Sequence, residues 1–269
     1  MCDCSECRRC RYDVLKSILN FAAFIAIIYV AMCVLLFFLQ RSLLYYPQPR
    51  AQGERSATMP LSVPGAELVI SLRAHDGPKA IIYFGGNGED VAYNLPEFSS
   101  AFPEHALYLM NYRGYGGSSG TPTEQAIHRD AQTLFDWVHE RHEHVVLLGR
   151  SLGSGVAIRL ASERPAARLV LITPYSSIVE LGARQFPYFP VRWLLQDKYE
   201  SWRYAPKIKI PTLVLAAEHD EVIPRASTDD LYARFEPGVA ALQVIPGAGH
   251  NTIGGSPLYL TSLRSGAGL

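Results

Sequence analysis

The stretch HVVLLGRSLGSG at residues 144–155 decides the fold of this chain. An apolar strand precedes the pattern G-x-S-x-G, which runs from Gly149 to Gly153, and a helix-forming segment begins at Ser154. When a strand turns this sharply into a helix, the residue at the turn takes a strained backbone conformation, and glycine neighbours prevent side-chain clashes. The pattern alone is common, but a strand before it and a helix after it make it specific. We therefore predict that Ser151 is a nucleophile at the edge of a sheet, next to a helix N-terminus.

Aliphatic runs alternate with helical stretches on both sides of this motif. The predicted strands are residues 68–72, 80–84, 106–110, 145–148, 169–172, 213–216 and 242–245, and the predicted helices include 124–140, 154–164 and 227–235. Such alternation builds βαβ units and a mostly parallel sheet. Several strands are continuous apolar runs, which indicates that helices cover both faces. The predicted fold class is α/β, with the site at the carboxyl ends of the strands.

A nucleophilic serine needs a histidine to accept its proton and an acid to orient that histidine. In this kind of sheet both partners follow the serine, in the order serine, acid, histidine. Of the eight histidines, His219 and His250 are the ones that follow Ser151. His250 comes after a predicted strand in a glycine-containing turn, so we predict it to be the general base. His219 adjoins an acidic loop and is predicted to be a surface or packing residue.

The loop after the predicted strand 213–216 supplies the candidate acids Glu218, Asp220 and Glu221. We select Asp220 because the apolar residues that follow it would hold the loop in place. The alternative is a surface loop with three solvated carboxylates, which the matching serine and histidine loops make less attractive.

Stabilising the negative oxygen of an acyl-transfer intermediate requires two backbone N–H donors. The first is expected from Leu152, directly after the nucleophile. The second is expected from the glycine-rich loop after the predicted strand 80–84, where we assign it to Asn87 and leave Gly86 as the alternative. An ordinary turn is the other interpretation of this loop.

Residues 18–39 form an uncharged run of 22 residues, with Asn20 as the strongly polar exception. About 20 apolar residues are needed to cross a bilayer, so we predict a single-pass membrane protein. A cleaved signal peptide is the alternative, but its apolar core would span about 7–15 residues. Basic residues are slightly more numerous before this run than after it, which predicts a cytoplasmic N-terminus and a catalytic domain on the non-cytoplasmic side.

Four segments are expected: a cysteine-rich tail (1–17), the transmembrane helix (18–39), a linker and edge element (40–66) and the catalytic domain (67–269). Every cysteine lies within the first 33 residues, so no disulfide framework holds the domain. Cys2, Cys4, Cys7 and Cys10 would need further ligands to enclose a metal. We predict a disordered tail open to S-acylation, with no metal or cofactor. Lys plus Arg balance Asp plus Glu at 25 each, which argues against a nucleic-acid partner.

Seven segments together resemble the membrane-anchored α/β-hydrolases of the Bem-type and serine-aminopeptidase-like group, which includes mammalian protein depalmitoylases. They are, in order, QRSLLYYPQP, FGGNGED, NYRGYGGSSGTPTE, LLGRSLGSG, TPYSSI, AAEHDEVIP and GAGHN. The resemblance implies the α/β-hydrolase fold, a triad of Ser151, Asp220 and His250, and an oxyanion loop at Asn87. Gly85 departs from many relatives, which carry histidine there, and this leaves the second oxyanion donor less certain than the triad.

The predicted function is hydrolysis of a carboxylic ester or thioester through an acyl-enzyme, with a small-molecule or lipid-like acyl substrate. An aminopeptidase is the second hypothesis, and it would need an acidic anchor for the substrate ammonium group, for which Glu89 and Asp90 are the candidates. A catalytically silent, membrane-tethered binding module is the third. The resemblance implies a cap or a modified helix at residues 174–209, and the aromatic cluster in this segment either lines an acyl pocket or packs as an ordinary core.

Overall fold

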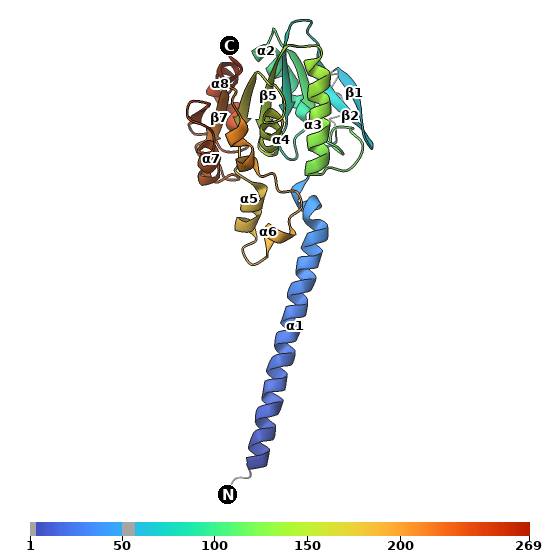
Figure 1. The fold of residues 1–269 in the computed structure, drawn as a ribbon, viewed down its shortest axis with the longest axis vertical. Coiled ribbons are helices and arrows are strands. Elements are labelled where there is room, and N and C mark those ends of the chain that lie inside the picture. The colour runs from blue at the N-terminus through green and yellow to red at the C-terminus, as the bar shows by residue number, and fades with distance from the viewer. Residues whose placement is uncertain (1–3, 50–56) are drawn as a thin grey trace.

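The computed structural model describes residues 4–49 and 57–269, with side chains from residue 9 onward. A long helix, α1 (Cys4–Leu44), projects from a layered α/β domain (Figure 1). Within the described residues, α1 is the one helix long and apolar enough to cross a membrane, by length and composition alone. It begins inside the cysteine-rich segment, whereas the sequence predicted disorder there. The helix continues because that segment has no proline or glycine to stop it, and extending an existing helix costs little.

The domain is built on one eight-stranded sheet in the order β1-β2-β4-β3-β5-β6-β7-β8. The strands are β1 (Thr58–Val63), β2 (Ala66–Arg73), β3 (Lys79–Phe84), β4 (Ala106–Met110), β5 (His144–Arg150), β6 (Arg168–Ile172), β7 (Thr212–Ala217) and β8 (Ala240–Ile245). Strands β3 to β8 are parallel, while β2 runs antiparallel to both β4 and β1. The seven predicted strands are confirmed, and β1 is an additional edge strand.

Helices cover both faces of the sheet and produce two separate cores. One core joins the sheet to α3 (Glu124–His139), α4 (Leu152–Ala161) and α7 (Arg225–Tyr232), and the other joins it to α2 (Leu95–Ala101) and α8 (Pro257–Ala267). Neighbouring residues of one strand, such as Ile81 and Ile82, belong to opposite cores because side chains alternate across a strand. This confirms the predicted α/β-hydrolase architecture.

Between β6 and β7 the chain forms a small cap, which we define as residues 178–195. It contains α5 (Ile178–Gln185) and α6 (Val191–Leu194) and lies beside the end of α1 that joins the domain (Figure 1). Single turns of 3-10 helix occur at Val91–Asn94, Ser201–Arg203, Ala205–Lys207 and Ile253–Gly255. Because α5 follows β6, the cap marks the carboxyl edge of the sheet, and this edge faces α1.

The last turns of α1 are joined to the domain by polar contacts. Arg41 Nε donates to Asp197 Oδ2 at 3.0 Å, and the hydroxyls of Tyr45 and Tyr199 lie 3.0 Å apart in a buried position. Burial raises the pKa of Tyr45, so this hydroxyl stays protonated. We call residues 40–46 with these partners the anchor junction.

Candidate active site

The turn from β5 into α4 holds Ser151 in a conformation that few residues adopt. Its φ is 48° and its ψ is −117°, in the positive-φ region where non-glycine residues are strained. A Cβ on Gly149 would lie 2.5 Å from the Gly153 oxygen, and a Cβ on Gly153 would collide with the Phe84 carbonyl. Both glycines are therefore required by close packing around the serine.

The structure brings Ser151, His250 and Asp220 together at the carboxyl edge of the sheet. His250 Nε2 lies 2.9 Å from Ser151 Oγ, and His250 Nδ1 lies 2.9 and 3.0 Å from the Asp220 carboxylate oxygens. The side chains of His250 and Asp220 are 6% and 7% exposed. Asp220 Oδ1 also accepts the backbone N–H groups of Val222 and Ile223, at 3.0 and 2.7 Å. Nδ1–H donation to Asp220 leaves Nε2 free to accept the serine proton.

The two acids that were not selected contact the histidine loop at its backbone. Glu221 accepts the His250 N–H at 2.9 Å, and this hydrogen bond lowers the pKa of Glu221. Glu218 accepts the Gly247 N–H at 2.8 Å. Both carboxylates therefore support the loop that carries the imidazole, a role that the sequence did not predict. His219 is mostly exposed, as expected for a surface residue.

Leu152 follows Ser151 directly, and the loop that carries Asn87 approaches the serine at Gly86, where an added Cβ would lie 3.6 Å from Ser151 Cβ. Leu152 is the first residue of α4, where N–H groups have no partner within the helix. The Gly86 N–H donates to Glu89 Oε2 at 2.6 Å, so this alternative donor is already engaged. The Asn87 side chain faces the anchor junction: its Nδ2 donates to the Leu44 carbonyl at 2.5 Å, and its Oδ1 accepts from the Tyr115 hydroxyl at 2.9 Å. The backbone N–H of Asn87 thus remains the candidate for the second donor.

A part-buried ion pair beneath the oxyanion loop was not predicted. Glu89 Oε2 lies 3.1 Å from Arg150 Nη1, and their side chains are 11% and 20% exposed. Burial lowers the pKa of Arg150, but the Glu89 carboxylate together with the Tyr83 and Tyr259 hydroxyls outweighs burial, so that the net effect raises this pKa. Arg150 Nη2 also lies 3.4 Å from the His250 carbonyl. The pair therefore links Arg150, the residue before Ser151, to the loop that contains Gly86 and to the loop that contains His250.

Glu89 is saturated by further donors. Its Oε1 accepts from the Tyr83 hydroxyl at 2.7 Å and from Asn94 Nδ2 at 2.6 Å, in addition to the contacts with Gly86 and Arg150. Four donors on one carboxylate leave little capacity for a substrate cation.

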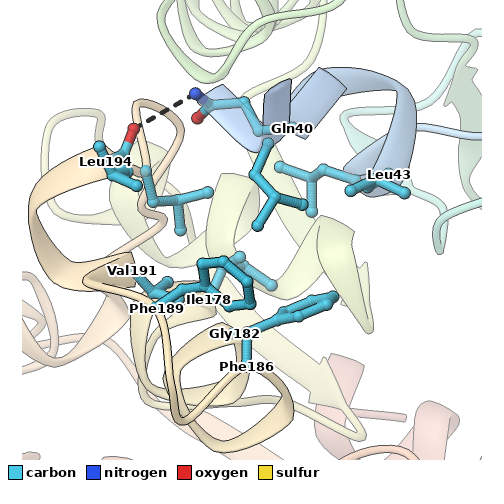
Figure 2. Close-up of a pocket in the computed structure, with 11 residues that line it drawn as sticks. Gln40, Leu43, Ile178, Gly182, Phe186, Phe189, Val191 and Leu194 are labelled. Atoms are coloured by element: carbon cyan, nitrogen blue, oxygen red, sulfur yellow. Dashed lines mark hydrogen bonds between the residues drawn. The ribbon is translucent and has the colours of Figure 1, made fainter. Parts of the chain in front are cut away.

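A polar and an apolar cavity lie at the carboxyl edge of the sheet. A polar cavity of about 730 Å³ lies over the oxyanion loop, and its walls include Gln48, Asn87, Arg150 and Asn251. An apolar pocket of about 150 Å³ lies between α1 and the cap (Figure 2).

Among the described residues, no group of three or more histidine, cysteine or acidic side chains is arranged to hold a metal ion. Cys2 and the side chains of Cys4 and Cys7 lie outside the described residues. Cys10 and Cys33 are free thiols.

The fold and the surroundings of Ser151 define an α/β-hydrolase. A family model described as serine aminopeptidase, S33, matches residues 101–204 and 191–256, more than half of the chain. The chain belongs to this family of hydrolases.

Three relatives indicate which group within this family the chain resembles. The uncharacterized protein Rv2307c of Mycobacterium tuberculosis is 31% identical over 91% of this chain and 90% of its own length. Protein bem46 of Schizosaccharomyces pombe is 28% identical over 58% of the chain and 56% of its own length. The lysophosphatidylserine lipase ABHD12 of Macaca fascicularis is 33% identical over 58% of the chain, which spans 45% of that protein. These matches confirm the resemblance to the Bem-type group.

A solved structure, the esterase Pf2001 of Pyrococcus furiosus, superimposes with a TM-score of 0.65 at 18% identity. The match covers 82% of this chain and 97% of the esterase. At this identity it shows the fold alone, and that fold agrees with the prediction.

Proposed function

We propose that the protein is a serine hydrolase that cleaves a carboxylic ester or thioester through an acyl-enzyme intermediate. The observation that carries the proposal is the continuous set of contacts from Ser151 Oγ through His250 to Asp220, each of about hydrogen-bond length. The strained backbone of Ser151 supports the same role, because strain of this kind gathers at reactive sites.

In the first half of the reaction, Ser151 Oγ attacks the carbonyl carbon while His250 Nε2 takes the hydroxyl proton. The oxygen that becomes negative binds the backbone N–H groups of Leu152 and Asn87. The bond to the leaving alcohol or thiol then breaks, and His250 returns its proton to that group. Water repeats the sequence in the second half, and the acid is released while the serine is restored.

The two candidate anchors for a substrate ammonium group already accept hydrogen bonds within the protein. This favours an ester or thioester over an aminoacyl substrate. Glu89 already accepts from four donors. Asp90 is buried and accepts the Ala92 N–H at 3.1 Å, which caps a turn of 3-10 helix. Neither carboxylate is presented for a substrate ammonium group. A silent binding module would not need a complete serine, histidine and aspartate set, so we rank it last.

The name of one relative, a lysophosphatidylserine lipase, supports a lipid-like acyl substrate.

We further propose that α1 crosses the membrane over residues 18–39. The cysteine-rich tail precedes this span, and a connecting and edge segment (40–66) and the catalytic domain (67–269) follow it. The basic N-terminal flank favours an orientation with the domain on the non-cytoplasmic side. A reporter that is active only in the cytoplasm, fused after Leu269, should be inactive; activity would reverse this orientation.

The hydrolase proposal is tested with a fluorophosphonate probe, which reacts covalently with activated serines. The wild-type protein should be labelled at Ser151, as mapped by peptide mass spectrometry. Ser151→Ala should abolish labelling, and Ser162→Ala, at the C-terminal end of the same helix, is the control that keeps it. Modification of another serine would contradict the assignment.

A further inference from the structure

The pocket between α1 and the cap is apolar on both sides. α1 contributes Leu36, Leu43 and Leu44, and the cap contributes Phe186, Phe189 and Leu194. Figure 2 shows Phe186 and Phe189 next to Ile178 on the cap side of the pocket. Its volume is about 150 Å³, and apolar cavities of about this size stay dry and take up small apolar groups. The pocket therefore suits a hydrocarbon segment rather than a polar ligand.

Gln40 is the polar side chain among the lining residues, and its amide is fully engaged. Its Nε2 donates to the carbonyls of Phe37 and Leu194, at 2.7 and 3.2 Å, and its Oε1 accepts the Gln196 N–H at 2.7 Å. Gln40 thus joins the two walls and offers no free polar group to the interior (Figure 2).

The cap also reaches along α1 toward the middle of its apolar run. The Tyr29 hydroxyl donates to the Tyr188 carbonyl at 3.0 Å, and the Tyr29 and Phe189 rings stack with centroids 5.8 Å apart. Tyr29 precedes Leu39 by ten residues, which is about 15 Å along a helix. With residues 18–39 in a hydrocarbon core of about 30 Å, this contact lies near the middle of the bilayer.

The outer surface of the cap matches such a setting. Tyr188 and Trp193 are 85% and 88% exposed. The six residues from Phe186 to Val191 carry no charge, and the exposed Arg192 follows them. Large apolar side chains projecting together from a protein mark a contact surface, and tryptophan beside arginine is typical of the bilayer interface. Leu194, next to Trp193, contacts Gln40. Gln40 is the first residue after the predicted membrane span.

Hydrogen bonds connect the surroundings of the pocket to both residues assigned to the oxyanion hole. Leu44 lines the pocket, and its carbonyl accepts from Asn87 Nδ2 at 2.5 Å. Tyr175, three residues before the pocket residue Ile178, donates to the Leu152 carbonyl at 3.1 Å. The polar cavity borders Asn87 as well. An amphiphile can therefore place its chain and its polar part in different cavities.

We propose that the cap is embedded in the bilayer and that the groove between α1 and the cap admits the acyl chain of a membrane lipid ester directly from the leaflet. The substrate carbonyl then lies at Ser151 while the polar part of the lipid lies toward the cavity that contains Arg150. This rests on the proposed function, both for hydrolysis at Ser151 and for α1 as a membrane span.

The pocket is tested with the full-length protein in phosphatidylcholine vesicles, using p-nitrophenyl acetate and p-nitrophenyl palmitate. A Cβ on Gly182 would lie 3.2 Å from Val191 Cγ1, so Gly182→Leu fills the pocket while favouring the helix. The palmitate to acetate ratio of kcat/KM should fall about tenfold. Ala183→Leu adds the same side chain to α5 outside the pocket lining and should leave the ratio within about twofold.

An unchanged ratio in Gly182→Leu, with acetate still hydrolysed, would overturn the pocket but not the hydrolase. Failure of the wild type to hydrolyse either ester or to bind the fluorophosphonate probe would overturn the proposed function and the pocket's role with it. If Gly182→Leu reduces hydrolysis of a vesicle-bound S-palmitoyl peptide but not of p-nitrophenyl palmitate, the pocket binds the acyl chain of a lipidated protein. That result would overturn the assignment to a membrane lipid ester.

Embedding of the cap is measured without any reaction. Tryptophan emission should be quenched by vesicle lipids brominated in their acyl chains, and Trp193→Phe should remove most of that quenching. Trp137 and Trp202, the remaining tryptophans, serve as internal controls in the domain. Equal quenching in wild type and Trp193→Phe would show that the cap lies outside the bilayer.

Discussion

The catalytic edge and the anchor junction are held together in different ways. At the catalytic edge, Ser151, Asp220 and His250 lie on loops that directly follow β5, β7 and β8, so the sheet sets their separation. At the junction, side chains distant in sequence bind each other, as Arg41 does with Asp197, 156 positions away. The first region derives its geometry from backbone pairing and the second from individual side-chain contacts.

The two regions meet at Asn87. Its backbone is assigned to the oxyanion hole, while its side chain binds the Leu44 carbonyl at the end of α1 and the Tyr115 hydroxyl. The contrast teaches that α1 also supports the proposed reaction site, because its last residue, Leu44, accepts a hydrogen bond from the loop that carries Asn87. Substitutions in the two regions should therefore affect different quantities: turnover at the edge and stability at the junction.

The largest effect is expected from Asp220→Asn. The amide would present an N–H to His250 Nδ1 and favour the wrong imidazole tautomer, so turnover should fall by about 10⁴-fold, as in the analogous change in a serine protease. Steady-state ester hydrolysis measures this, with circular dichroism to verify folding. Glu218→Gln, in the same loop, is the control and should cost far less. Damage by Glu218→Gln together with a harmless Asp220→Asn would move the acid to Glu218.

An intermediate effect is expected from the Arg150–Glu89 pair, whose residues position the loops without touching the reacting atoms. Arg150→Met should lower kcat by about 10- to 100-fold with little change in KM, because the oxyanion loop loses its support. Glu89→Gln should act similarly, and the double variant should cost less than the sum of the two.

The matched control is the exposed pair of Arg225 and Asp229, with side chains 45% and 49% exposed. Arg225→Met should leave kcat unaltered, because exposed ion pairs contribute little. Additive losses in the Arg150 and Glu89 double variant would show that the two residues act separately.

The smallest effect is expected at the junction, from Tyr45→Phe. The change leaves the buried Tyr199 hydroxyl without its partner, which costs about 1–2 kcal/mol of stability and lowers Tm by a few degrees, roughly 2–4 °C per kcal/mol. Thermal unfolding in detergent measures the shift, and kcat should stay within about twofold. Tyr46→Phe removes a hydroxyl from a residue that is 52% exposed and should leave Tm unaltered. Equal Tm shifts in the two variants would show that the hydrogen bond between Tyr45 and Tyr199 makes no specific contribution to stability.

The fold and the serine, histidine and aspartate positions were predictable because their signals are local. A strand, a glycine-flanked serine and a helix occupy twelve consecutive residues, and the chain order of the partners follows from the topology. Asp220 could be preferred over its neighbours because Val222 and Ile223, which follow it, do bind its carboxylate through their backbone.

Other features depend on contacts that no local pattern contains. Pro60 occupies an exposed position of β1, and proline is tolerated there because β1 is an edge strand. The contact between Arg150 and Glu89 joins residues 61 positions apart. The side of the pocket formed by α1 is held against the cap by contacts between distant residues, such as Gln40 and Leu194, which are 154 positions apart. These residues meet because tertiary packing brings them together, so the contacts can be identified only in the folded structure.

The direct passage of α1 into the anchor junction has a mechanical consequence. With Arg41, Tyr45 and Tyr46 all bound to the domain, the helix and the domain must tilt as one body. A helix whose apolar run exceeds the local bilayer thickness tilts to compensate. With α1 as the proposed membrane span, thinner membranes would rotate the whole domain toward the lipid surface, and bilayer thickness would set the angle at which Ser151, the proposed nucleophile, meets its substrate.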